Sequence, residues 1–185
     1  MRIRYNAPAV LSFSLLCVAV FVLGMLVPPI QLLFFVPGSG GFAFSQPLSW
    51  FRLLSHAAGH ASWDHLLGNL SFILLLGPIL EEKYGSGRLL GMMLATALIT
   101  GVLNVLLFSS GLLGASGIVF MFILLVSFTN FRNGEIPLSF LLIVAVFLSR
   151  ELLQGLRADH VAQFAHLIGG ACGSLFGFRL AGRRA

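Results

Sequence analysis

Charged residues are scarce in this chain. Only 9% of its 185 residues are Asp, Glu, Lys or Arg, whereas 58% are hydrophobic. A soluble domain carries about a quarter charged residues, so this sequence cannot surround a core with a polar surface. The composition excludes a soluble globular domain and indicates a protein with several membrane-spanning helices.

Cysteine is also rare, and a nucleic-acid-binding pattern is missing. Cys17 and Cys172 both lie inside apolar runs, which argues against a disulfide framework, and a metal site would need more ligands. The formal charge of +5 comes from residues in short gaps between apolar runs, with no basic stripe interleaved with aromatics. We therefore predict no nucleic-acid partner and attribute the charge to membrane topology.

The apolar runs predict six membrane spans of about 20 residues. They are placed at Ala9–Val27, His60–Leu80, two within Leu89–Phe131 around a turn at 109–111, Ile136–Ser149 and Val161–Leu180. Arg2 and Arg4 before the first run are also typical of a signal peptide, but a clear cleavage site is missing, so we expect a retained span. The predicted fold is a single all-α transmembrane domain over residues 1–185, a six-helix bundle.

The connector between the first two spans, Pro28–Gly59, is apolar in patches and interrupted by glycine and proline. These interruptions make it too broken to span. Trp50 and Phe51 favour the boundary between membrane and water. We predict a long interfacial loop here.

The positive charges predict the orientation. With six spans, both termini share one side with eight of the eleven lysines and arginines: Arg2, Arg4, Lys83, Arg88, Arg132, Arg179, Arg183 and Arg184. The other side has only Arg52, Arg150 and Arg157. Both termini are therefore predicted to be cytoplasmic.

Polar residues inside spans are costly and are functional by default. In this chain they gather at the outer ends of the second, fourth and sixth spans: His60, His65, Asn69, Ser116 and His166. Polar residues that only pack between helices would not be expected to lie at the same depth in the membrane on three separate spans. We therefore predict one site that joins these three spans.

Each of these residues also has a packing interpretation. His65 and Asn69, four apart on one helical face, are either hydrogen-bonding glue between helices or donors that stabilise an oxyanion. Ser116, between small residues, is either a helix contact or a nucleophile. His166 borders the stripe Gly169, Gly173 and Gly177 and is either a buried structural histidine or, if the stripe faces the fourth span, a base for Ser116.

A zinc site is the competing chemistry. His56, His60 and His65 cluster, and His166 is a possible fourth ligand, but the Glu of an H-E-x-x-H motif is missing. Asp64 is expected to point elsewhere because it is adjacent to His65 on a helix. We predict no metal and no cofactor.

Taken together, the motifs resemble the rhomboid family of intramembrane serine proteases. They are His60…His65…Asn69 on the second span, Gly114-Ala115-Ser116-Gly117 opening the fourth, and His166 before Gly169-Gly170 on the sixth. The resemblance implies that Ser116 is the nucleophile, His166 the base without a third acid, and that His65, Asn69 and the Ser116 amide form the oxyanion hole.

The resemblance also assigns supporting roles and shows two departures. His60 is similar to a supporting histidine, Gly114 opens the serine motif, and Arg52 is similar to the arginine of a Trp-Arg pair. Phe51 separates Trp50 from Arg52, so the loop is expected to differ. Phe120 stands where the family usually has tyrosine; it can stack on the histidine but cannot hydrogen-bond.

The resemblance implies hydrolysis of peptide bonds in transmembrane protein substrates through an acyl-enzyme, within the lipid bilayer. In a bacterial cell this would be the inner, or plasma, membrane. A catalytically silent rhomboid-like binder is the main alternative, although such binders usually lack the serine or the histidine. A small transporter would place polar residues in both halves of the membrane. The sequence does not indicate a substrate or an oligomeric state.

Overall fold

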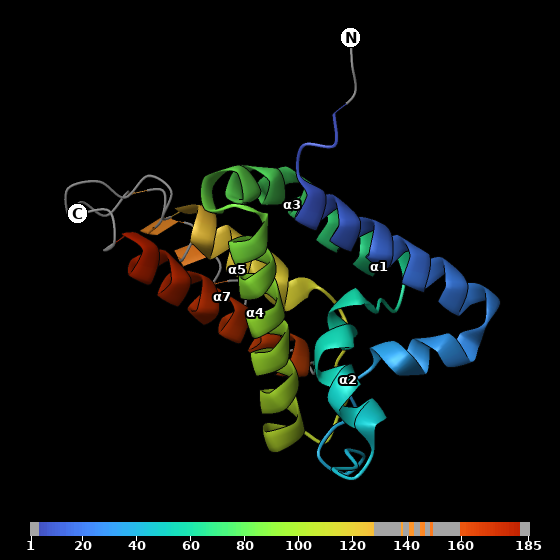
Figure 1. Ribbon diagram of the computed structural model, residues 1–185. Helices are drawn as coiled ribbons and strands as arrows, with labels where there is room; N and C mark the ends of the chain where they lie inside the picture. The colour runs from blue at the N-terminus through green and yellow to red at the C-terminus, as the bar shows by residue number, and fades with distance from the viewer. Residues whose placement is uncertain are drawn as a thin grey trace.

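The computed structural model describes residues 4–127 and 160–181, with isolated helical positions at 138, 141, 142, 145, 146 and 149 between them. The described part is helical, with one isolated β-bridge, and its helices pack side by side as a bundle (Figure 1). Most of the predicted fifth span, Ile136–Ser149, lies outside the described residues. The predicted count of six spans therefore stays a prediction, whereas the all-helical class is confirmed.

The main helices follow the predicted spans. They are α1 (Pro8–Leu26), α3 (Trp63–Tyr84), α4 (Ser86–Leu107), α5 (Ser116–Ser127) and α7 (His160–Ala181). Helices α1, α3 and α4 are long and apolar enough to cross a membrane. The second span was predicted to start near His60, but α3 begins three residues later because Ser62 is its N-cap, accepting from the His65 amide at 3.1 Å.

The connector between α1 and α3 has more regular structure than a loop. It contains a 3-10 helix η1 (Pro28–Phe34), helix α2 (Pro47–Ser55) and a 3-10 turn η2 (His56–Ala58). Pro28 and Pro47 each occupy the first helical position, where proline costs no hydrogen bond. None of these pieces is long enough to span, as expected, and the interfacial position of the connector stays a prediction.

The turn between α3 and α4 is short and lies among charged residues. Gly85 alone separates the helices, with a φ of 82° that favours glycine. Glu81, near the end of α3, is buried. It is 4% exposed, and its carboxylate accepts from the amides of Ala9 and Val10 at 2.9 Å. This carboxylate caps the N-terminus of α1, where free amides favour a negative charge.

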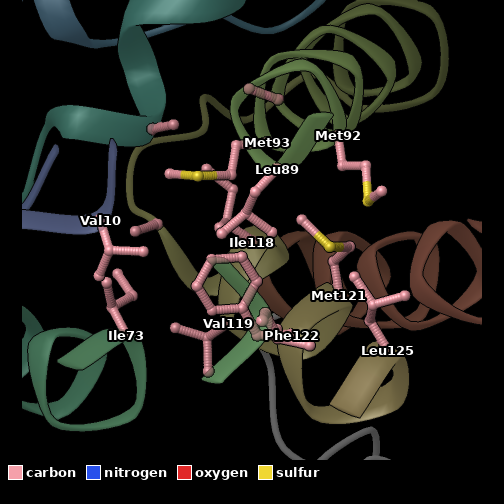
Figure 2. Close-up of a cluster of buried hydrophobic side chains, with 14 of the residues drawn as sticks. Val10, Ile73, Leu89, Met92, Met93, Ile118, Val119, Met121, Phe122 and Leu125 are labelled. Atoms are coloured by element: carbon pink, nitrogen blue, oxygen red, sulfur yellow. The ribbon is translucent and has the colours of Figure 1, made fainter. Parts of the chain in front are cut away.

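The apolar core lies where α1, α3, α4 and α5 meet (Figure 2). Phe122 on α5 is fully buried there, together with Val10 and Ile73. A Cβ added to Gly77 on α3 would lie 2.7 Å from Val10 and 3.0 Å from Phe122. Gly77 thus lets α1 and α5 approach α3 closely, which fixes the frame that carries the polar end of α3.

Candidate active site

A cavity of about 550 Å³ opens between α3, the α4–α5 loop, α5 and α7. Five of the predicted site residues line it: His65, Asn69, Ser116, Phe120 and His166. They come from three helices far apart in the sequence. The structure therefore brings residues from these three spans to one cavity.

Asn69 is oriented by a histidine from outside its helix. Its side-chain nitrogen lies 3.0 Å from His60 Nε2, and both side chains are buried. His60 Nδ1 lies 3.3 Å from the Ala58 carbonyl oxygen. A carbonyl only accepts, so His60 carries its proton on Nδ1 and its Nε2 accepts from Asn69. The other donor hydrogen and the oxygen of Asn69 remain available to the cavity.

The neutral form of His60 is favoured by its surroundings. Burial, and then the nearby His65, lower the pKa of His60 to about 4. The two rings meet edge to face with centroids 5.0 Å apart. His60 therefore remains a hydrogen-bond acceptor for Asn69 at neutral pH.

Ser116 is the first residue of α5. The Ala115 carbonyl accepts the amide of Val119 at 3.0 Å, so the helical hydrogen-bond pattern starts immediately before Ser116. The first amides of a helix have no intrahelical partner, and this end carries partial positive charge. The sequence thus puts a hydroxyl and free N–H donors at one edge of the cavity.

Gly114 brings the α4–α5 loop against the oxyanion candidates. Its φ is 124°, and an added Cβ would lie 2.7 Å from the His65 ring and 3.9 Å from Asn69 Nδ2. Both the backbone angle and the space require glycine. The loop is further fixed by paired hydrogen bonds between Val36 and Leu112, at 2.9 and 3.0 Å.

His56 supports the site in a way the sequence did not reveal. Its backbone oxygen accepts the Gly114 amide at 2.9 Å, and its Nε2 lies 3.0 Å from the Ala97 carbonyl oxygen on α4. Burial lowers its pKa to about 4. In the sequence His56 appeared only as a candidate zinc ligand.

The glycine stripe of α7 contacts α5 through Gly169 and Gly173. An added Cβ on Gly169 would lie 2.0 Å from the Gly117 carbonyl oxygen, and one on Gly173 would lie 2.3 Å from that of Met121. The two backbones are therefore in direct contact. His166 precedes Gly169 by about one turn, and Ser116 precedes Gly117, so this contact brings both side chains to one cavity.

Phe120 packs on His166. The ring centroids are 4.2 Å apart, with an angle of 35° between the planes. Phe120 is one turn after Ser116 on α5, so the stack holds the imidazole on the serine side of α7. The stacking implied by the resemblance is confirmed here, with phenylalanine in place of tyrosine.

Arg52 does not line the cavity. Its Nε donates to the Leu32 carbonyl at 2.6 Å, while Trp50 Nε1 donates to the Phe44 carbonyl at 3.0 Å. Phe51, the extra residue between them, packs edge to face on Phe34. Arg52 therefore fixes α2 to η1 and supports the site only through the connector.

The expectation for the position of Asp64 was wrong. It was expected to point away from His65, but both residues line the cavity. The cavity covers a broad face of α3, so neighbours 100° apart can both reach it. Even so, within residues 4–127 and 160–181 no three His, Cys, Asp or Glu side chains gather in a way that could hold a metal ion.

Comparisons with known proteins agree on one family. The family model described as "Rhomboid domain" matches residues 47–183. The chain is 26% identical over 131 residues to "Rhomboid protease GlpG" of Haemophilus influenzae, covering 69% of this chain and 68% of that protein. It is 28% identical over 174 residues to "Rhomboid protease GlpG" of Yersinia pestis and of Yersinia pseudotuberculosis, covering 92% of this chain. The chain spans 62% of the length of these Yersinia relatives.

Proposed function

This chain belongs to the rhomboid family of integral membrane proteins, and from that membership we propose that it is an intramembrane serine endopeptidase. In the proposal, Ser116 and His166 form a catalytic dyad that hydrolyses peptide bonds in or near transmembrane segments. The observation that carries the proposal is the cavity that both residues line, together with His65 and Asn69.

The proposed reaction begins with attack of Ser116 Oγ on the scissile carbonyl carbon, while His166 takes the hydroxyl proton. The carbonyl oxygen becomes negative in the tetrahedral intermediate. Asn69, His65 and the amide of Ser116 are the proposed donors to this oxygen, and the partial positive charge at the start of α5 adds to their effect. These donors act mainly when charge develops, which is how they would accelerate the reaction.

Collapse of the intermediate breaks the C–N bond, and His166 gives its proton to the leaving amine. Water then attacks the acyl-enzyme while His166 takes a proton from it. The ester C–O bond breaks to release the carboxylic acid, and His166 returns the proton to Ser116 Oγ. A dyad without a third acid needs another means of holding the imidazole. The stack of Phe120 on His166, at 4.2 Å between centroids, supports that role for this chain.

A fluorophosphonate test separates a protease from a silent rhomboid-like binder. The purified chain should be labelled covalently, and Ser116→Ala should abolish the label. Ser71→Ala is a matched control, because Ser71 is an exposed serine on α3 whose hydroxyl bonds to the Leu67 carbonyl of its own helix. Labelling that survives Ser116→Ala would refute the assignment.

Cleavage of a reporter transmembrane substrate tests the dyad itself. Members of a catalytic unit act together, so removing either should cost nearly as much as removing both. Ser116→Ala, His166→Ala and the double variant should reach the same low rate, and chelators should have no effect. Cleavage that requires a metal would favour the zinc alternative instead.

A further inference from the structure

One wall of the cavity combines an acidic rim with a gap. Asp64, Gly68 and Phe72 lie four residues apart on α3, and all three line the cavity. Successive members are therefore one helical turn apart, about 6 Å along the axis. Phe72 lies near the middle of α3, Gly68 lies one turn before it, and Asp64 lies in the first turn of the helix.

Gly68 leaves open space in this wall. An added Cβ there would meet no atom within 4 Å, unlike Gly114, whose Cβ would contact His65. Tight packing therefore does not explain Gly68. The gap gives room for a ligand side chain to lie along α3 between Phe72 and the exposed Asp64.

The residues of this wall favour one kind of ligand side chain. A long apolar stem would bury surface against Phe72 and the bare helix backbone at Gly68. A cationic head would reach the Asp64 carboxylate at the aqueous rim, as lysine and arginine side chains do when they snorkel. A small side chain would leave the gap unfilled, and an acidic one would be repelled.

We propose that the Asp64–Gly68–Phe72 wall is a subsite that selects substrates with arginine or lysine beside the scissile bond. The inference rests on the proposed function, because it places this subsite next to the Ser116 centre. It makes Asp64 a specificity-determining residue. A role limited to stabilising the N-terminus of α3 would affect every substrate equally.

Binding to the Ser116→Ala chain tests the subsite without requiring turnover. Fluorescent transmembrane segments would carry Ala, Gln, Arg or Glu at each position from two residues before to two residues after the scissile bond. Kd would be measured by anisotropy in detergent. At one position, Arg should bind about three- to tenfold more tightly than Gln, and Glu should bind most weakly.

Two variants and one control identify the cause. Asp64→Asn should bring the Arg-to-Gln ratio close to one, and Gly68→Leu should lower the Arg-to-Ala ratio by filling the gap. Glu82→Gln removes the same charge from the exposed surface near the other end of α3 and should keep the Arg-to-Gln ratio.

The inference is overturned if no segment binds, if Asp64→Asn leaves the ratios unchanged at every position, or if Glu82→Gln lowers them equally. The proposed function would fail separately, through the absence of a fluorophosphonate label on Ser116. A labelled chain with Asp64-independent binding would remain a protease without this subsite.

Discussion

At the scale of single residues, Asn69 both bonds to His60 and lines the cavity. One side-chain N–H is donated to His60 at 3.0 Å, which fixes the amide so that the rest of the group faces the cavity. The sequence predicted that Asn69 and His65 share a face, and this is confirmed. The partner that orients the amide could not be predicted, because it depends on the path of the chain between Ala58 and Ser62.

We expect Asn69→Ala to lower kcat by about 10- to 1000-fold while KM changes little, since an oxyanion donor acts mainly in the transition state. Folding should survive, because hydrogen bonds between membrane helices average below about 1 kcal/mol. Steady-state kinetics and a thermal melt check both points. If Asn69→Ala lost thermal stability but kept full turnover, Asn69 would be a structural residue that only bonds helices together.

Phe120→Tyr should be tolerated, with activity equal to or above that of the parent chain. Tyrosine keeps the ring that stacks on His166 and adds a hydroxyl at the cavity wall. Phe120→Leu is the matched control and should lose activity, because it removes the stack. A large loss in Phe120→Tyr would mean that the cavity is packed around phenylalanine and leaves no room for the oxygen.

At the scale of elements, the α5–α7 contact determines whether the proposed dyad can form. Gly169→Ala would put a methyl group 2.0 Å from the Gly117 carbonyl oxygen, so α7 must move away from α5. We expect cleavage to fall by at least about 100-fold, because misplacement by about 1 Å is enough to cost that much. Gly91→Ala is the control, since Gly91 on α4 has open space around it.

Two buried histidines, His56 in η2 and His60 after it, should make stability depend on pH. Burial lowers the pKa of His56 and of His60 from 6.5 to about 4. Between these values the folded chain binds fewer protons than the unfolded chain, so the free energy of unfolding rises with pH. The contribution is complete above about pH 6.5 and is lost as the pH falls toward 4. Thermal melts from pH 4 to 8 would show this slope, and His60→Gln should flatten it.

The elements also show why the sequence predicted some features and missed others. Hydropathy located the helices within a few residues, because a span needs about 20 apolar residues. The glycine stripe predicted the face of α7 because Gly169 and Gly173 have a fixed helical spacing. The connector was predicted as a loop, since its helices depend on contacts such as that of Arg52 with Leu32, which no local pattern contains.

At the scale of the whole molecule, the location of the cavity makes the orientation functionally important. The residues that line it come from the α4–α5 loop and mainly from the N-terminal halves of α3, α5 and α7. The predicted topology puts these parts on the side away from both chain termini. Hydrolysis needs water, so the cavity must open toward one aqueous side of the bilayer. With both termini in the cytoplasm, the substrate would be cut near the outer face.

Reporter fusions test this orientation directly. The eight-to-three distribution of lysine and arginine predicts a cytoplasmic reporter at Ala185 and an outer reporter at Gly155, because positive loops stay inside. Moving charge should weaken the preference: replacing Lys83 and Arg88 by glutamine would leave six positive residues against three. A reporter inserted at Gly85, in the single-residue turn between α3 and α4, should share the side of Ala185. If Ala185 and Gly155 report the same side, the last predicted span does not cross the membrane and the six-span arrangement is wrong. If they report opposite sides with Ala185 outside, the orientation is reversed and the cavity opens to the cytoplasm.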